Sequence, residues 1–170
     1  VVAILAAWGY TGGAKPYGYR GFGEVSVFVF FGLVAVLGTT YVQAERLTWP
    51  ALAGGVACGS LACAILVTNN LRDIPTDTLS GKRTLAVVIG DRRSRVLYPA
   101  LVGTALVVPL VLAPAVPTAL LALLAAPLAI GPVETVRSGT LGRELVPVLA
   151  ATGRLQLVFG VLLAVGLALG

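Results

Sequence analysis

Long apolar runs are the feature of this sequence that most restricts its fold. Each approaches the length of about 20 mostly apolar residues that an α-helix needs to cross a bilayer. The runs are 24–43, 50–70, 96–114, 117–133 and 154–170, and residues 1–10 have the composition of the end of a sixth. The pattern predicts an all-α, multi-span transmembrane helical bundle with about five full spans plus the end of a sixth. We expect one domain over residues 1–170.

The composition supports lipid as the environment of these runs. Hydrophobic residues make up 58% of the chain and charged residues only 11%, whereas soluble proteins carry about a quarter charged residues. The formal net charge is +5, but the basic residues cluster between the apolar runs, where membrane topology accounts for them. We therefore expect the lipid bilayer as a partner and no nucleic acid.

The basic residues alternate between the connections. Lys and Arg together number two, one, six, zero and two in connections 11–23, 44–49, 71–95, 114–117 and 134–153. Because basic residues are enriched in the cytoplasmic loops of membrane proteins, the alternation predicts that connections 11–23, 71–95 and 134–153 are cytoplasmic. We expect a protein that crosses the inner or plasma membrane several times.

Small residues within the second run suggest close helix packing. Gly55 and Gly59 have the GxxxG spacing that lets two backbones approach each other, although a glycine-rich chain also produces this spacing by chance. Cys58 and Cys63 lie in the same run, and a disulfide within one helix at their spacing is implausible. We interpret both cysteines as small packing residues.

The stretch NNLRDIPTDTLSGKRT, residues 69–84, gathers charge directly after an apolar run. Asp73 and Asp77 are four residues apart, which places both carboxylates on one face of a helix. Pro75 disfavours helical geometry at Ile74, so the spacing predicts that the span ends or kinks there. In either case we expect the two acids to stay close together.

Two carboxylates with nearby bases are suited to a metal-bound diphosphate. Mg²⁺ prefers oxygen ligands and commonly binds one or two protein carboxylates together with substrate phosphates. Lys82 and Arg83 follow the acids and suit the remaining phosphate charge, and Arg72 either does the same or pairs with an Asp. The alternative is a solvated loop whose acids pair with its own bases and contribute little.

Two further connections carry residues that could bind a ligand. The stretch YTGGAKPYGYRGFGE contains Lys15, and its glycines allow a backbone to approach a ligand closely. Its tyrosines can pack on an aromatic substrate or equally form an interfacial aromatic belt. In the last connection, we interpret Arg137 and Arg143 as topology-determining charges rather than as site residues.

These motifs resemble the UbiA superfamily of intramembrane prenyltransferases. NNLRDIPTDTLSGKRTLAVVIG is similar to the second aspartate-rich motif of that superfamily, in the form found in members that prenylate 1,4-dihydroxy-2-naphthoate in menaquinone biosynthesis. YTGGAKPYGYRGFGE and GRELVPVLAATG resemble the central and last cytoplasmic loops, in the same order. The likeness covers nearly the whole chain.

The resemblance implies a Mg²⁺-dependent enzyme that transfers a polyprenyl group from its diphosphate to 1,4-dihydroxy-2-naphthoate, giving demethylmenaquinone. Asp73 and Asp77 would be the catalytic Mg²⁺ ligands of the second motif. The residues implied to lie at the substrates are Asn69 and Asn70, of which Asn70 is favoured as the contact, Arg72, Lys82, Arg83, Lys15, Tyr10 and Tyr17.

The family pattern is incomplete in this sequence. The superfamily has nine membrane helices, and its first aspartate-rich motif, which precedes all of the matched motifs, is absent here. We therefore expect this sequence to be the C-terminal part of a longer protein and to be inactive alone. The alternatives are a prenyltransferase for another acceptor, such as 4-hydroxybenzoate or a chlorophyll-type ring, a transporter with a metal or anion site at one face, and a structural membrane subunit.

Overall fold

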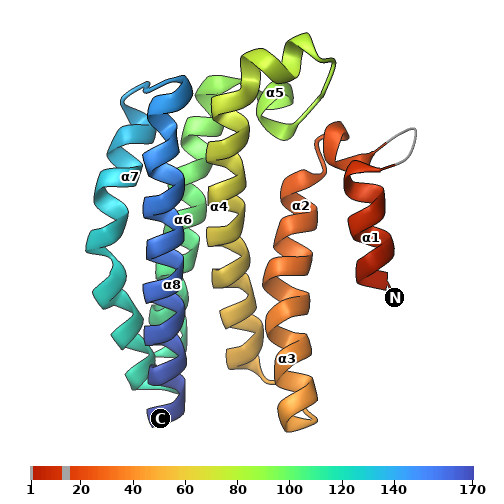
Figure 1. Cartoon of the computed structure of the whole chain (residues 1–170). Coiled ribbons are helices and arrows are strands. Elements are labelled where there is room, and N and C mark those ends of the chain that lie inside the picture. Colours follow the sequence, from red (N-terminus) through yellow and green to blue (C-terminus); the bar gives the residue numbers. More distant parts are fainter. Residues whose placement is uncertain (1, 13–15) are drawn as a thin grey trace.

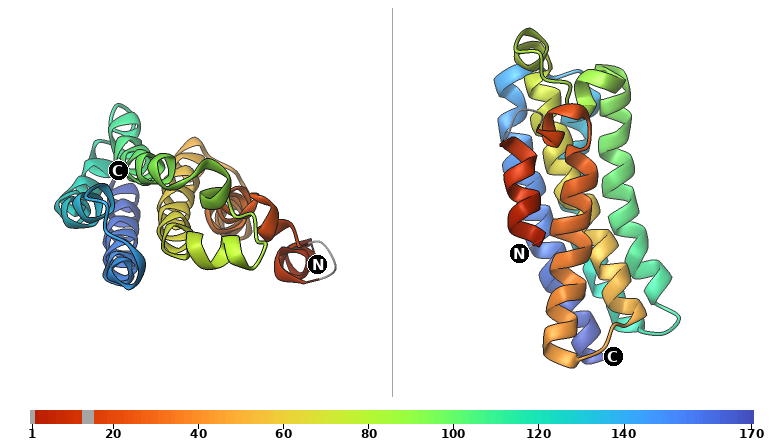
Figure 2. Two further views of the ribbon diagram at one scale, coloured as in Figure 1. Left: turned by 90° about the horizontal axis from the view of Figure 1, so that it is seen from above. Right: turned by 90° about the vertical axis from the view of Figure 1, so that its right-hand side faces the viewer.

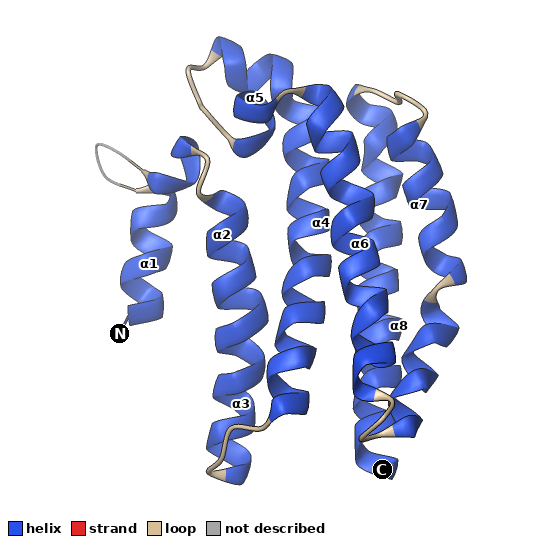
Figure 3. Cartoon of the chain, turned by 180° about the vertical axis from the view of Figure 1, so that it is seen from behind, coloured by secondary structure: helices blue, strands red, loops and turns tan. Residues whose placement is uncertain are grey.

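The computed structural model describes residues 2–12 and 16–170, which form helices and connections without any strand (Figures 1 and 3). The chain begins with three short elements: α1 (Val2–Thr11), the 3₁₀ turn η1 (Tyr17–Arg20) and α2 (Gly23–Val27). The remaining elements are η2 (Phe28–Val34), α3 (Ala35–Ala44), α4 (Trp49–Leu79), α5 (Leu85–Ile89), α6 (Asp91–Leu112), η3 (Pro117–Ala125), α7 (Pro127–Arg137), η4 (Gly142–Leu145) and α8 (Val146–Leu169). The predicted all-α bundle is confirmed.

Four helices are long and apolar enough to cross a membrane, namely Gly23–Ala44, Trp49–Leu79, Asp91–Leu112 and Gly142–Leu169. The first comprises α2, η2 and α3, which run on as one helix. A fifth candidate span is the pair η3 and α7, which bend by 48° at their junction. These five positions match the five predicted runs, and the chain is that of an integral membrane protein.

Helix α4 lies in the middle of the molecule and holds it together. It packs against α6 and α8 on one side and against η2 and α3 on the other. Its buried residues include Ala57, Leu61, Ala64 and Val67, and most of them are small, so neighbouring helices can approach closely. Helix α1 lies at the opposite edge from α7, beyond α2 (Figure 2).

The close approach predicted from the GxxxG spacing is confirmed. Gly32, within the π-helical turn η2, faces Gly55 and Gly59 of α4. A Cβ atom at Gly32 would lie only 2.6 Å from the Cα of Gly59 and 2.7 Å from the carbonyl oxygen of Gly55. The two backbones therefore touch, and η2 and α4 are locked together at this level. Cys58 and Cys63 are both free, as expected.

The span 117–133 differs from a regular helix. Its first part, η3, is a 3₁₀ helix, in which residues three apart lie above one another. Ala119, Ala122 and Ala125 follow that spacing and are fully buried, and η3 packs mainly on α8. The Thr118 hydroxyl also donates to the carbonyl oxygen of Gly166 at 2.6 Å. Close packing of this alanine row stabilises a geometry that is unusual over nine residues.

Two predicted boundaries are wrong by about two helical turns, and α6 also begins about one turn early, at Asp91 rather than at residue 96. Helix α4 continues through Pro75 to Leu79 rather than ending near Asn70, because proline removes only one backbone donor so close to a helix end. Helix α8 begins at Val146 rather than at residue 154, so Arg154 lies within it and not at its foot. Pro147 at the first turn favours this earlier start.

The three basic connections lie at the same end of the bundle (Figure 1). The backbone N–H of Arg83 donates to the carbonyl oxygen of Tyr19 at 3.0 Å, which joins connection 71–95 to connection 11–23. The Arg95 guanidinium donates to the carbonyl oxygens of Val136 and Thr140, which joins connection 71–95 to connection 134–153. We call this the basic end.

Candidate functional site

The last three turns of α4 carry the predicted acidic motif. Asn69, Asp73 and Asp77 follow one another at intervals of four residues, so they lie along one side of the helix where it reaches the basic end. Asn69 and Asp73 are half-buried, and Asp77 is buried. The continuation of α4 through Pro75 keeps both carboxylates on a helix instead of a loop. Its last turns bend away from the axis of the rest of α4, in agreement with the predicted kink near Ile74 (Figure 1).

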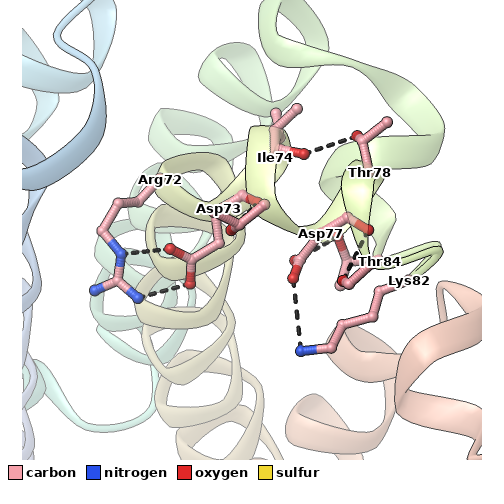
Figure 4. A network of polar contacts seen from close by, with 9 residues as sticks. Arg72, Asp73, Ile74, Asp77, Thr78, Lys82 and Thr84 are labelled. Carbon is pink, nitrogen blue, oxygen red and sulfur yellow. Dashed lines mark hydrogen bonds and ion pairs between the residues drawn. The ribbon is translucent and has the colours of Figure 1, made fainter.

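The two carboxylates have different basic partners (Figure 4). Arg72 binds Asp73 in a two-pronged ion pair, with Nε–Oδ1 and Nη2–Oδ2 distances of 2.7 and 2.6 Å. Both residues line a cavity of about 640 Å³ that also contains Arg143. Arg143, which the sequence led us to interpret as a topology charge, thus adds positive charge beside Asp73.

Asp77 has looser contacts. Its Oδ1 lies 3.7 Å from Lys82 Nζ, and its Oδ2 accepts a long hydrogen bond of 3.5 Å from the Thr84 hydroxyl. Lys82 Nζ also lies 4.9 Å from the ring centroid of Tyr19. The Arg83 side chain is exposed at the same turn. The structure therefore brings Lys82 next to Asp77, whereas Arg83 is held at the same turn by its backbone contact to Tyr19.

A mainly apolar cavity lies about one helical turn from the cavity lined by Arg72 and Asp73. It has a volume of about 390 Å³ and is lined by Asn69 and Gln156 and by apolar side chains of α2, η2, α4 and α8, namely Val27, Phe31, Ala62, Ile65, Leu66 and Leu149. Asn69 precedes Asp73 by about one helical turn, and Leu149 follows Val146 of the polar cavity by about one turn. The two cavities therefore adjoin along α4 and α8, and we call them together the α4–α8 groove.

Tyr10 and Tyr17 line a separate cavity of about 540 Å³ between α1 and the helix that begins with α2. Their rings meet edge to face with centroids 5.6 Å apart. The Tyr17 hydroxyl donates to the Ala6 carbonyl oxygen at 2.7 Å and lies 3.2 Å from the Ser26 hydroxyl. Both tyrosines remain predicted substrate neighbours, and Lys15 lies outside the described residues.

Asn70 contacts a residue that sequence reasoning missed. Its Nδ2 donates to Glu24 Oε1 at 2.9 Å, and the two residues are only 8% and 7% exposed. Glu24 Oε2 is buried and has no hydrogen-bond partner among the described residues. The pair joins the first turn of α2 to the acidic motif of α4. A lone acid at the start of the run 24–43 was the available signal, because ionisable residues within spans are costly to bury.

The family model for the UbiA prenyltransferase family matches residues 1–144. The chain belongs to this family. Two relatives named 1,4-dihydroxy-2-naphthoate octaprenyltransferase cover nearly all of it. The one from Mycobacterium tuberculosis is 56% identical over 99% of this chain and 58% of its own length. The one from Haemophilus influenzae is 41% identical over 100% of this chain and 56% of its own length.

The UbiA chain described here thus spans little more than half the length of these relatives. A UbiA prenyltransferase domain-containing protein 1 homolog from Drosophila melanogaster is 35% identical over 52% of the chain and 24% of its own length. No solved structure matches the chain significantly. The family assignment agrees with the motifs of connections 11–23 and 71–95, which lie within the matched region, whereas most of GRELVPVLAATG, residues 142–153, lies beyond it.

The donor set of this UbiA chain fits a divalent metal, on which members of the family generally depend. No group of three or more His, Cys, Asp or Glu side chains gathers within residues 2–12 and 16–170. Two carboxylates one turn apart nevertheless suit a metal such as Mg²⁺, which completes its shell with water and substrate phosphates. Of the two, Asp77 has the longer contacts, whereas both oxygens of Asp73 are engaged by Arg72.

Proposed function

We propose that the intact protein is a Mg²⁺-dependent enzyme that transfers a polyprenyl group from its diphosphate to 1,4-dihydroxy-2-naphthoate with loss of CO₂. The direct product is the hydroquinone demethylmenaquinol, and demethylmenaquinone forms from it in a separate oxidation. The observation that carries the proposal is the α4–α8 groove, in which Arg72, Asp73 and Arg143 adjoin an apolar cavity. An amphipathic donor with a charged head and a hydrocarbon tail needs this combination. The names of the two relatives that cover nearly the whole chain support the acceptor.

The polar end of the groove suits the diphosphate. Arg72 and Arg143 line this cavity and provide cationic donors for phosphate oxygens. We expect Lys82, beside Asp77, and Arg83 in the same turn to add donors from the next turn of the chain. The apolar end, with Phe31, suits the prenyl tail. Asn69 lies where the two parts meet, so we expect it near the first carbons of the donor.

The reaction requires the bond between the allylic carbon and the diphosphate oxygen to break with both electrons passing to oxygen. Mg²⁺, held by Asp73 and Asp77, would supply charge neutralisation for this leaving group. Arg72 and Lys82 would stabilise the charge that develops on the departing diphosphate, because preorganised donors act most strongly where charge appears. Arg72 must then release one or both oxygens of Asp73.

The acceptor ring supplies the electron pair for the new carbon–carbon bond. A dihydroxynaphthoate is electron-rich, and loss of its carboxylate as CO₂ returns an electron pair to the ring. This explains how a chain with no His can serve the reaction. We place the acceptor beside Tyr10 and Tyr17, whose rings line the cavity next to α2. The protein would span the plasma membrane, with its basic end on the cytoplasmic side.

The test uses the full-length protein in nanodiscs and measures prenyl transfer to 1,4-dihydroxy-2-naphthoate. Asp73→Asn and Asp77→Asn should each abolish turnover, and chelation of Mg²⁺ should do the same. Glu134→Gln, an exposed acid on α7, is the matched control and should retain activity. Product formed after chelation, or by both Asn variants, would contradict the proposal. Transfer to 4-hydroxybenzoate instead would place the protein with the other acceptor class.

A further inference from the structure

Tyr19 contacts both Lys82 and Arg83, although it lies far from them in the sequence. Its ring lies beneath the ammonium of Lys82, 4.9 Å from ring centroid to Nζ. Its carbonyl oxygen accepts the backbone N–H of Arg83 at 3.0 Å. Tyr19 lies in η1, which ends at Gly21 in a left-handed conformation with φ of 82°. The turn that carries Lys82 and Arg83 is therefore docked on η1 through one residue.

The position of Lys82 reflects a balance between two attractions. Its ammonium lies 3.7 Å from Asp77 Oδ1, which is longer than the roughly 2.7–2.9 Å of a direct charge-assisted hydrogen bond. The ring face attracts the same ammonium by a cation–π interaction. Since the Lys82 side chain is still 40% exposed, its N–H donors can reach a ligand.

We propose that Tyr19 is a positioning residue of the diphosphate site, which keeps Lys82 directed at the ligand and away from direct contact with Asp77. The proposal rests on the proposed function, because it takes Lys82 as a diphosphate contact. A lysine has a long flexible stem, and its ammonium is strongly hydrated. A fixed aromatic face restricts that stem before the ligand arrives, so less freedom is lost when the ligand binds.

A simple packing role for Tyr19 would have different consequences. In that case, any apolar side chain of similar size would serve, and the effect of a substitution would not depend on Lys82. Leucine keeps the backbone contact to Arg83 and much of the apolar bulk, but it has no ring face. Phenylalanine keeps the ring face and loses only the hydroxyl. The pair Tyr19→Leu and Tyr19→Phe therefore isolates the ring.

The experiment measures binding of inorganic pyrophosphate to the full-length protein in nanodiscs by calorimetry, with Mg²⁺ at a fixed concentration. Tyr19→Leu should raise the dissociation constant about 2- to 30-fold, the range expected for loss of a cation–π contact. Tyr19→Phe should stay within about twofold of wild type, the lower limit of that range. Lys82→Gln should weaken binding, and adding Tyr19→Leu to it should change nothing further, because interacting residues are not additive.

Kinetics give a second readout that packing alone would not move. Tyr19→Leu should raise KM for the prenyl diphosphate and leave KM for the naphthoate unchanged. Equal losses in the Leu and Phe variants, or additive losses in the double variant, would overturn the role of the ring. If Lys82→Gln itself binds pyrophosphate as wild type does, the diphosphate site of the proposed function fails. If Lys82→Gln weakens pyrophosphate binding but Tyr19→Leu does not, the proposed function stands and the proposed role of Tyr19 fails.

Discussion

Replacing Gly32 by alanine should separate two helices that now touch through their backbones. The added Cβ would lie 2.6 Å from the Cα of Gly59, 2.7 Å from the carbonyl oxygen of Gly55 and 2.9 Å from the backbone nitrogen of Gly59. All three neighbours are main-chain atoms of α4, so no side-chain rotation can relieve the contact. Because non-bonded carbon atoms prefer about 3.5–4.0 Å, η2 and α4 must move apart by about 1 Å.

We expect this overpacking to cost about 1–3 kcal/mol of stability. Each kcal/mol lowers Tm by about 2–4 °C in proteins of about 150–250 residues. We therefore expect Tm to fall by about 2–12 °C. The measurement is thermal unfolding of the full-length protein in one detergent at a fixed scan rate. Since α4 carries both aspartates, the same variant should also lose turnover at temperatures below its Tm.

Gly38→Ala is the matched control. Gly38 lies in α3, the continuation of the same helix, and a Cβ there would have no neighbour within 4 Å. This substitution should keep or slightly raise Tm, because alanine is about 0.5–1 kcal/mol better than glycine within a helix. Equal Tm values for the two variants would refute the view that Gly32 is required by the contact with α4.

Two further predictions concern the buried pair at α2 and the topology. Glu24→Ala leaves the Nδ2 of Asn70 buried without its acceptor, so Tm should fall by an amount equivalent to about 1–3 kcal/mol. Glu24→Gln keeps an acceptor oxygen, so its Tm should lie within a few degrees of wild type. A similar loss of Tm in both variants would show that the charge, not the hydrogen bond, is required. The topology is tested by cysteine labelling with a membrane-impermeant reagent. A cysteine at Ser80 should react only from the cytoplasmic side and one at Glu45 only from the opposite side, and the reverse pattern would invert the proposed orientation.

The number and order of the spans could be predicted from the sequence because hydropathy and charge report directly on the bilayer. The same signals could not locate two helix ends. Hydropathy falls where charges begin, so it placed the end of the second span near Asn70, although α4 continues to Leu79. The charges around Arg143 and Arg154 likewise hid the start of α8 at Val146. The 3₁₀ geometry of η3 depends on packing against α8, which no local pattern encodes.

The acidic motif and its two basic neighbours could be predicted for a related reason, because their spacing within one stretch is visible in the sequence. Contacts between distant stretches are not visible in this way. The family resemblance implies Tyr10 and Tyr17 as substrate neighbours, yet Tyr19 is the tyrosine that contacts Lys82. The partner of Asn70, Glu24, also comes from another connection. The identity of such partners depends on which loops the bundle brings together.

The long-range contacts at the basic end have a consequence for biosynthesis. Glu24 and Asn70 are 46 residues apart, and Arg95 and Thr140 are 45 apart. At about 5–20 residues per second, a ribosome needs several seconds to make that much chain. Helix α2 therefore enters the membrane with a carboxyl group whose partner has not yet been synthesised. The insertion machinery must shelter that group until α4 arrives, so substitutions at Asn70 should reduce the yield of assembled protein as well as its activity.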